Sequence, residues 1–198
     1  MRLAVLLALV ASPLFAETVA IPVGGKTITF DVPDGYVQTF EQATDKAFIR
    51  GYSPPEVADK PWTELITLTV TRNLAGLPSL STVDFANFGL SALQSQCLGD
   101  FGKDVISAED YTVSGQPALA IFIACANDTG KPDGHAQQVA FIAFRGTGDF
   151  YAIQWIERSA PSEKAAPYDK AIWQDRVDML VASARLCDLK DGEAAPCP

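Results

Sequence analysis

Histidine occurs only once in this sequence, at His135, and no motif pairs it with a nucleophile. The chain also lacks a G-x-S-x-G pentapeptide, the turn that presents the serine of many Ser–His–Asp hydrolases. We therefore predict that the protein is not an enzyme, with no catalytic residue and no cofactor. A hydrolase that uses His135 as its general base is the least favoured alternative.

Clusters of basic residues are also missing from the sequence. The chain has 15 Lys and Arg against 24 Asp and Glu, which gives a formal net charge of -9. Nucleic acids are bound by Lys and Arg side chains that neutralise phosphates, and anionic membranes repel an acidic protein. We therefore expect neither nucleic acid nor an anionic lipid surface as a partner.

No hydrophobic run reaches the ~20 residues of a membrane-spanning helix, so stable membrane insertion is not expected. The apolar run Leu3–Ala11 follows Arg2 and precedes Ala16, which is the pattern of a secretory signal peptide. Glu17 follows instead of the cysteine that a lipid anchor needs. We expect cleavage near Ala16 and a soluble periplasmic or secreted protein. The predicted organisation is a signal peptide at 1–16, one domain at 17–187 and a polar C-terminal tail at 188–198.

The four cysteines are Cys97, Cys125, Cys187 and Cys197, and none belongs to a C-x-x-C motif. Thiol exchange and close-spaced zinc ligation lack their usual spacing, so no metal site is predicted. In an exported chain four cysteines indicate two disulfides, with three possible connectivities. We favour Cys97–Cys125, which would join a helix to a strand. Its companion, Cys187–Cys197, would hold the polar tail against the last helix.

The periodicity of apolar residues predicts both strands and helices. Segment 80–97 has apolar residues at three- and four-residue spacing after Ser81 and Asp84, a capping-box start, so it is expected to be an amphipathic helix. A second helix is expected near 168–187. Alternating or β-branched runs predict strands at 26–32, 46–53, 63–72, 105–113 and 116–126.

Two strand-length apolar runs flank the glycines of Gly146-Thr147-Gly148-Asp149. A phosphate-binding loop would need a helix after the glycines, whereas Phe150–Arg158 is aromatic and β-branched. We therefore interpret the segment as a β-hairpin. Both faces of its strands are apolar, so the sheet must be covered on both sides. The predicted fold is α+β, an antiparallel sheet with helices on both faces, which is an α/β/α sandwich.

The order of these elements resembles the PsbP-like superfamily, which includes extrinsic photosynthetic subunits and bacterial DcrB-type envelope proteins. The matching segments are FDVPDGY, WTELITLTVTR, SGQPALAIFIA, GTGDFYAIQWIE and LVASARLC. The resemblance implies an α/β/α sandwich and a largely non-enzymatic role in assembly, stabilisation or binding. The superfamily has no shared catalytic motif, so no functional residue is carried over. The missing lipid-attachment cysteine and the four cysteines depart from its DcrB-type members.

These observations predict an exported, non-catalytic protein that binds another envelope protein or helps its stability or assembly. Tyr52 and Trp62, at the ends of a proline-rich loop, are the candidate binding residues. The alternative is a carrier of a small apolar ligand, held between sheet and helix near Phe85, Phe88 and Phe141.

Overall fold

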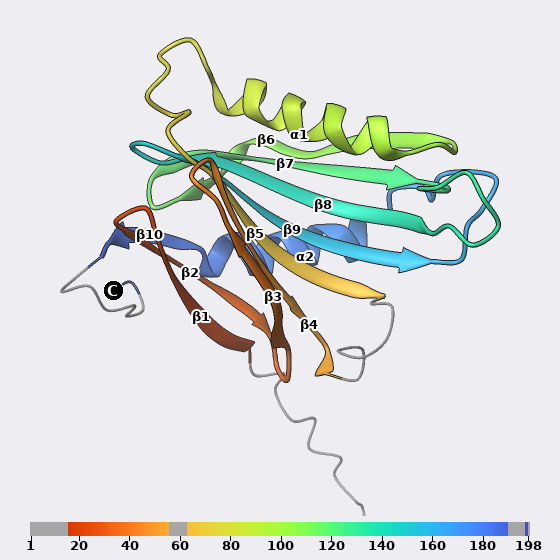
Figure 1. The fold of residues 1–198 in the computed structure, drawn as a ribbon, viewed down its shortest axis with the longest axis horizontal. Helices are drawn as coiled ribbons and strands as arrows, with labels where there is room; N and C mark the ends of the chain where they lie inside the picture. The colour runs from red at the N-terminus through yellow and green to blue at the C-terminus, as the bar shows by residue number, and fades with distance from the viewer. Residues whose placement is uncertain (1–15, 56–62, 190–196, 198) are drawn as a thin grey trace, which may run out of the picture.

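The computed structural model describes residues 16–55, 63–189 and 197 (Figure 1). Nearly all of the predicted signal peptide, Trp62, and most of the predicted C-terminal tail therefore lie outside the described residues. The described elements, in chain order, are β1 (Ala16–Val23), β2 (Lys26–Pro33), β3 (Val37–Ala43), β4 (Ala47–Ser53), β5 (Glu64–Thr71), α1 (Thr82–Gln96), β6 (Phe101–Val113), β7 (Gln116–Cys125), β8 (Ala136–Arg145), β9 (Phe150–Ser159), α2 (Lys170–Ser183) and β10 (Arg185–Asp188).

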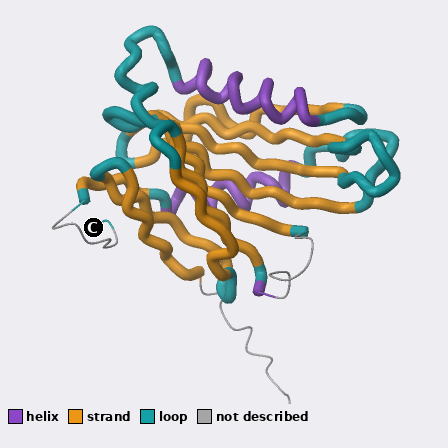
Figure 2. Tube along the Cα trace, in the orientation of Figure 1, coloured by secondary structure: helices purple, strands orange, loops and turns teal. Residues whose placement is uncertain are grey.

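The strands of the described ranges form two antiparallel sheets. The larger sheet has the order β3-β4-β5-β9-β8-β7-β6, and the smaller sheet has the order β1-β2-β10. Figure 2 shows how the long strands of the larger sheet separate the two helices. The sheet therefore has two covered faces, and a different set of elements covers each of them.

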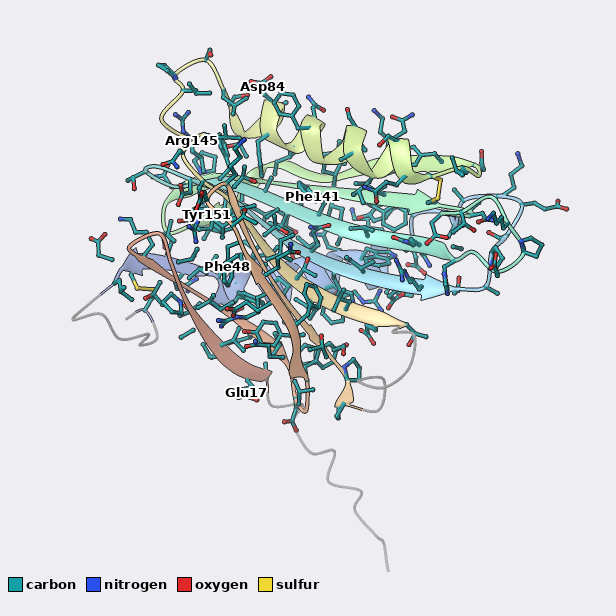
Figure 3. The ribbon with its side chains drawn as sticks, in the orientation of Figure 1. Glu17, Phe48, Asp84, Phe141, Arg145 and Tyr151 are labelled. Carbon is teal, nitrogen blue, oxygen red and sulfur yellow. A yellow bond between two sulfur atoms is a disulfide. The ribbon has the colours of Figure 1, made fainter. Side chains whose placement is uncertain are left out.

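Alternation along β8 sends apolar side chains to both faces of the larger sheet. Phe141 and Ala143 face α1, and Figure 3 shows Phe141 on that side. Ile142 and Phe144 point to the other face, where they join one core with residues of α2 and of β1 and β2. The sequence-based prediction of two apolar faces in this hairpin is confirmed.

The predicted α/β/α sandwich is wrong, because helices alone do not cover both faces of a single sheet. Within the described residues the chain is mostly strand, and the smaller sheet covers one face together with α2. The expected helix near 168–187 ends at Ser183, since Ala184 is extended and Arg185–Asp188 pairs with β2. The pairing partners of β10 lie about 160 residues away in sequence, so local periodicity does not reveal this strand.

Helix α1 begins as predicted. The Ser81 hydroxyl accepts from the backbone N–H of Asp84, and the Asp84 carboxylate accepts from the backbone N–H of Ser81 at 2.9 Å. The loop before the helix is held by Arg145 of β8, which donates to the carbonyl oxygens of Leu80, at 3.1 Å, and of Ala75. The start of α1 is therefore tied to the sheet beneath it.

The glycine segment between β8 and β9 is the tight turn of a hairpin, as predicted. The backbone N–H of Gly146 donates to the carbonyl of Asp149 at 2.9 Å, and Phe150 begins β9 directly. The Asp149 carboxylate accepts from the backbone N–H of Asn73 at 2.8 Å. This carboxylate therefore holds a neighbouring loop in place.

Candidate functional site

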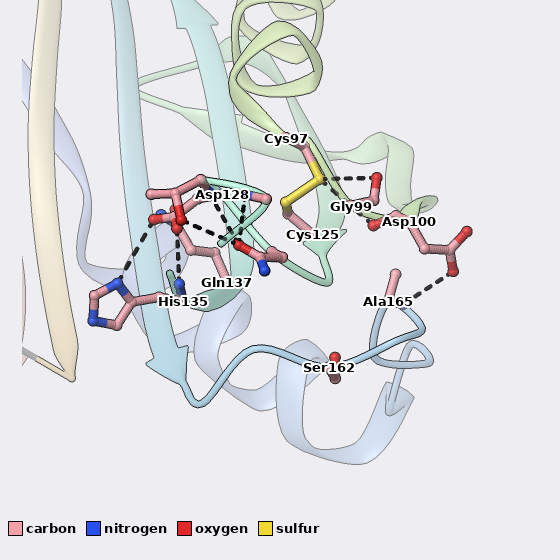
Figure 4. Close-up of a disulfide and its surroundings, with 12 residues drawn as sticks. Cys97, Gly99, Asp100, Cys125, Asp128, His135, Gln137, Ser162 and Ala165 are labelled. Carbon is pink, nitrogen blue, oxygen red and sulfur yellow. Dashed lines mark hydrogen bonds and ion pairs between the residues drawn. A yellow bond between two sulfur atoms is a disulfide. The ribbon is translucent and has the colours of Figure 1, made fainter. Parts of the chain in front are cut away.

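The two disulfides join Cys97 to Cys125 and Cys187 to Cys197, which are the pairings favoured from the sequence. Cys97 is the C-cap of α1, and Cys125 ends β7. Next to this bond, the backbone N–H groups of Leu98 and Gly99 both donate to the carbonyl of Asn127, at 3.1 and 3.0 Å. The C-terminal end of α1 is therefore fixed to the sheet (Figure 4).

A groove of about 390 Å³ opens beside the Cys97–Cys125 disulfide. It lies between the C-terminal end of α1 and the ends of β7, β8 and β9. Its apolar lining includes Leu93, Phe101, Ile123 and Val139, and its polar lining includes Asp128, Gln137 and Arg158. An apolar surface with a few convergent polar groups has the composition of a small-molecule site.

Asp128 is the centre of the polar network in this groove. Its carboxylate accepts from the backbone N–H of His135 at 2.8 Å and from the side-chain amide of Gln137 at 2.9 Å. Arg158 Nη2 and His135 Nδ1 each lie 3.9 Å from the same carboxylate oxygen. Burial by itself would raise the pKa of Asp128, but these hydrogen bonds and charges outweigh it and the pKa is lowered.

Asp128→Asn should lower the free energy of unfolding by about 1–2 kcal/mol at neutral pH, because an amide NH₂ would face the donors of Gln137 and Arg158. The carboxylate stabilises the fold above its unfolded pKa of about 4, and this stabilisation is lost as the pH falls through the lowered folded pKa. Urea titrations between neutral and acid pH should therefore show the two proteins converging in acid. Asp133→Asn, in the same loop but exposed, is the control. A constant difference at all pH values would contradict the assignment.

The exposed side of α1 is nearly free of charge. Asp84, which is used in the capping box, is the single charged residue of the helix. The uncharged exposed face of α1 consists of Val83, Asn87, Phe88, Ser91, Ala92, Gln94, Ser95 and Gln96. Phe88 is 63% exposed on this face, and Leu98 just beyond the helix is also exposed. This face is polar but uncharged, and the exposed ring of Phe88 lies among its Asn, Ser and Gln side chains.

Tyr52 and Trp62 do not form a described surface together. Tyr52 is only 5% exposed, with its ring edge against Phe30, and Trp62 lies outside the described residues. His135 lies beside Asp128, which lines the groove. The exposed phenylalanine rings of the described residues are instead Phe88 on α1, at 63%, and Phe40 on β3, at 41%.

The seam between α1 and the sheet is filled where a ligand had been predicted. Phe85 stacks on Phe150 with ring centroids 4.7 Å apart, and Phe141 fills the space in front of Gly89. Phe88, the third residue of that prediction, points outward. The seam is open at the groove by Cys97.

The sequence itself contains a signal for the α1 face, which is its lack of charged residues. Residues 85–99 contain no charged side chain in a chain where charged residues make up 20%. The period of the apolar residues indicates the buried side of the helix, whereas the lack of charged residues is a property of its exposed side. The groove had no comparable signal, because its lining comes from four separate segments.

Within the described residues, no helix has the length and apolar character needed to cross a membrane. No group of three or more His, Cys, Asp and Glu side chains is arranged to hold a metal ion in the same part of the chain.

No protein-family model matches the chain, and no curated protein sequence matches it. Solved structures do match. The Ran-binding protein Mog1p of Saccharomyces cerevisiae has a TM-score of 0.54 and 15% sequence identity, over 86% of this chain and 95% of that one. LpqN of Mycobacterium tuberculosis, described as involved in cell envelope biogenesis, has a TM-score of 0.41 and 12% identity, over 89% and 92%. The overlap with Mog1p shows that this chain has a Mog1/PsbP-like fold.

Proposed function

We propose that the protein is an exported, non-catalytic binding protein whose uncharged α1 face docks onto another envelope protein and supports its stability or assembly. The observation that carries this proposal is the 63% exposure of Phe88 on a helix whose single charged residue, Asp84, is engaged in the capping box, in a protein with a net charge of -9. Interface cores are depleted in charged residues and enriched in aromatic ones. An exposed aromatic anchor on such a face is therefore suited to a protein partner.

The attachment of α1 at both ends supports this role. Arg145 holds the loop that enters the helix, and the Cys97–Cys125 disulfide holds its exit. Gly89 lets the helix lie close over the sheet, because a Cβ there would be 2.6 Å from the Phe141 ring. A rigid helix loses little conformational entropy on binding, so more of the contact energy remains as affinity.

Other observations agree with the export and binding parts of the proposal. Two disulfides suit an oxidising compartment, and the sequence begins with the pattern of a signal peptide. Mog1p, which shares the fold, is a Ran-binding protein, so this fold can serve protein binding. The partner proposed here is a different one, because an exported chain meets other envelope proteins.

The test is native co-purification of the tagged mature protein from the periplasm, with mass spectrometry of the captured proteins. Phe88→Asp should weaken capture of a specific partner by about 30-fold or more, the effect of losing an interface anchor worth about 2 kcal/mol. Ile172→Asp, at a 48% exposed position of α2, is the matched control and should retain the partner. Equal capture by both variants, with unchanged melting temperatures, would contradict docking on α1.

The groove favours a second candidate function, the carriage of a small apolar ligand. Its apolar lining and its volume of about 390 Å³ would accept such a molecule at the end of the seam, away from Phe85 and Phe141. Native mass spectrometry of protein purified without detergent would record a bound adduct. A partner-free protein that carries an adduct would favour the carrier function over the docking function.

A further inference from the structure

A second cavity, of about 300 Å³, lies on the opposite face of the larger sheet from the groove. It is formed by Ala16 at the start of β1, the end of β2 with the turn that follows it, the start of β5, one residue of β9 and one of α2. Its lining includes Pro33, Asp34, Tyr36, Glu64, Trp155 and Met179. The α1 face and the groove do not share any of these residues, so the cavity is a separate feature of the molecule.

Two aromatic rings form a corner of this cavity. The ring centroids of Tyr36 and Trp155 lie 6.5 Å apart, and their planes are inclined at 60°. The electron-rich face of an aromatic ring attracts a cation within about 6 Å of the ring centre. Trp155 is buried, and its indole Nε1–H has no hydrogen-bond acceptor among the described residues.

Carboxylates supply the opposite charge at the same cavity. Glu64 and Tyr36 both line the cavity, and Glu64 is close enough to the Tyr36 hydroxyl to affect its pKa, which places the carboxylate beside the aromatic corner. No ion pair within the described ranges includes Glu64 or Asp34. The Arg176 guanidinium lies over the Trp155 ring, 5.1 Å from the ring centroid, and its charge is paired with Glu157. The carboxylates that line the cavity are therefore still available to a cation.

The hydroxyl of Tyr36 keeps its proton over the whole useful pH range. Burial raises the pKa of Tyr36 above its ordinary value, and the hydrogen bond to Glu64 raises it further. The negative charge of this pair therefore belongs to Glu64.

We propose that this cavity binds the ammonium group of an organic cation, with the Tyr36 and Trp155 rings around the group and Glu64 as its counter-ion. Quaternary and lysine-type ammonium groups are the cations that aromatic corners with a carboxylate recognise. The volume of about 300 Å³ accepts such a group with a short apolar stem against Pro33 and Met179. The net charge of -9 also attracts cationic ligands to the molecule.

The test is a calorimetric titration of the full-length mature protein with choline and, separately, with Nα-acetyl-lysine amide. At least one should bind with a dissociation constant of about 1 mM, the range of a small fragment in a good pocket. Tighter binding of choline indicates a free quaternary amine as the natural ligand, whereas tighter binding of the lysine amide indicates a lysine of a protein or peptide. The uncharged isostere of choline, with carbon in place of nitrogen, should bind about tenfold more weakly.

Substitutions locate the site. Glu64→Gln should weaken binding of the preferred cation about fivefold, and Glu163→Gln, a loss of equal charge at an exposed loop, should leave it unchanged. Phe88→Asp should also leave it unchanged, which separates this cavity from the proposed docking face. Absence of binding by both cations, equal binding of the uncharged isostere, or equal loss in the two glutamine variants would overturn the proposal. Melting temperatures show that each variant is folded.

Discussion

Trp173→Ala is expected to lower the free energy of unfolding by about 4 kcal/mol, the largest effect of a single substitution that we predict. Trp173 is 1% exposed and is the bulkiest of the fully buried side chains. Its ring lies 5.2 Å from the Phe122 ring on β7, and the Arg176 guanidinium lies 4.5 Å from its ring centroid. The substitution would remove the ring and leave a cavity between α2 and the larger sheet.

The preceding residue of α2 is the control for that experiment. Ile172 is exposed, so Ile172→Ala removes apolar atoms from the same helix without making a buried cavity, and it should cost less than about 1 kcal/mol. Urea unfolding followed by circular dichroism measures both changes. If both variants lose the same stability, Trp173 does not join α2 to the sheet in the way that its burial indicates.

Removal of the Cys97–Cys125 disulfide, by serine at both positions, is expected to cost about 3.5 kcal/mol. The bond closes a loop with a sequence separation of 28, and the unfolded chain regains the corresponding conformational freedom when the bond is absent. The C-terminal end of α1 would also lose its covalent attachment to β7. We therefore expect the same variant to bind the proposed envelope partner more weakly.

The second disulfide is the matched comparison. Cys187 and Cys197 are separated by 10 residues, so serine at both positions should cost about 2.7 kcal/mol by the same relation. Unfolding in guanidinium, with and without a thiol reductant, measures both variants against the parent protein. A larger loss for the 187–197 pair would contradict an effect governed by loop length, and would instead indicate that the smaller sheet depends on the C-terminal end of the chain.

Features of the structure that depend on nearby residues were predictable from the sequence. The capping box of Ser81 and Asp84 joins residues three apart, and the turn at Gly146 and Asp149 joins residues equally close. The two disulfide pairings were favoured from the elements on which the cysteines were expected to lie. The general resemblance to the PsbP-like fold was also visible, since it depends on the order of the elements, and the overlap with Mog1p supports it at the level of the fold.

Features that depend on distant residues were not predicted. The smaller sheet needs β10 to pair with β2, and the sequence of Arg185–Asp188 resembles the continuation of a helix until that partner is known. Tyr52 was considered as a surface residue, but its ring packs against Phe30 of β2. The cavity beside Tyr36 and Trp155 brings together five separated parts of the chain.

The sequence by itself determined the acidic charge, the cysteine content, the local caps and turns, and the two apolar faces of the central hairpin. These properties follow from composition and from interactions between residues close in the chain. Only the tertiary structure decided how the second face is covered, where the seam under α1 is filled or open, and which carboxylates lie next to aromatic rings. Those outcomes depend on side-chain packing between segments far apart in sequence, which no local pattern specifies.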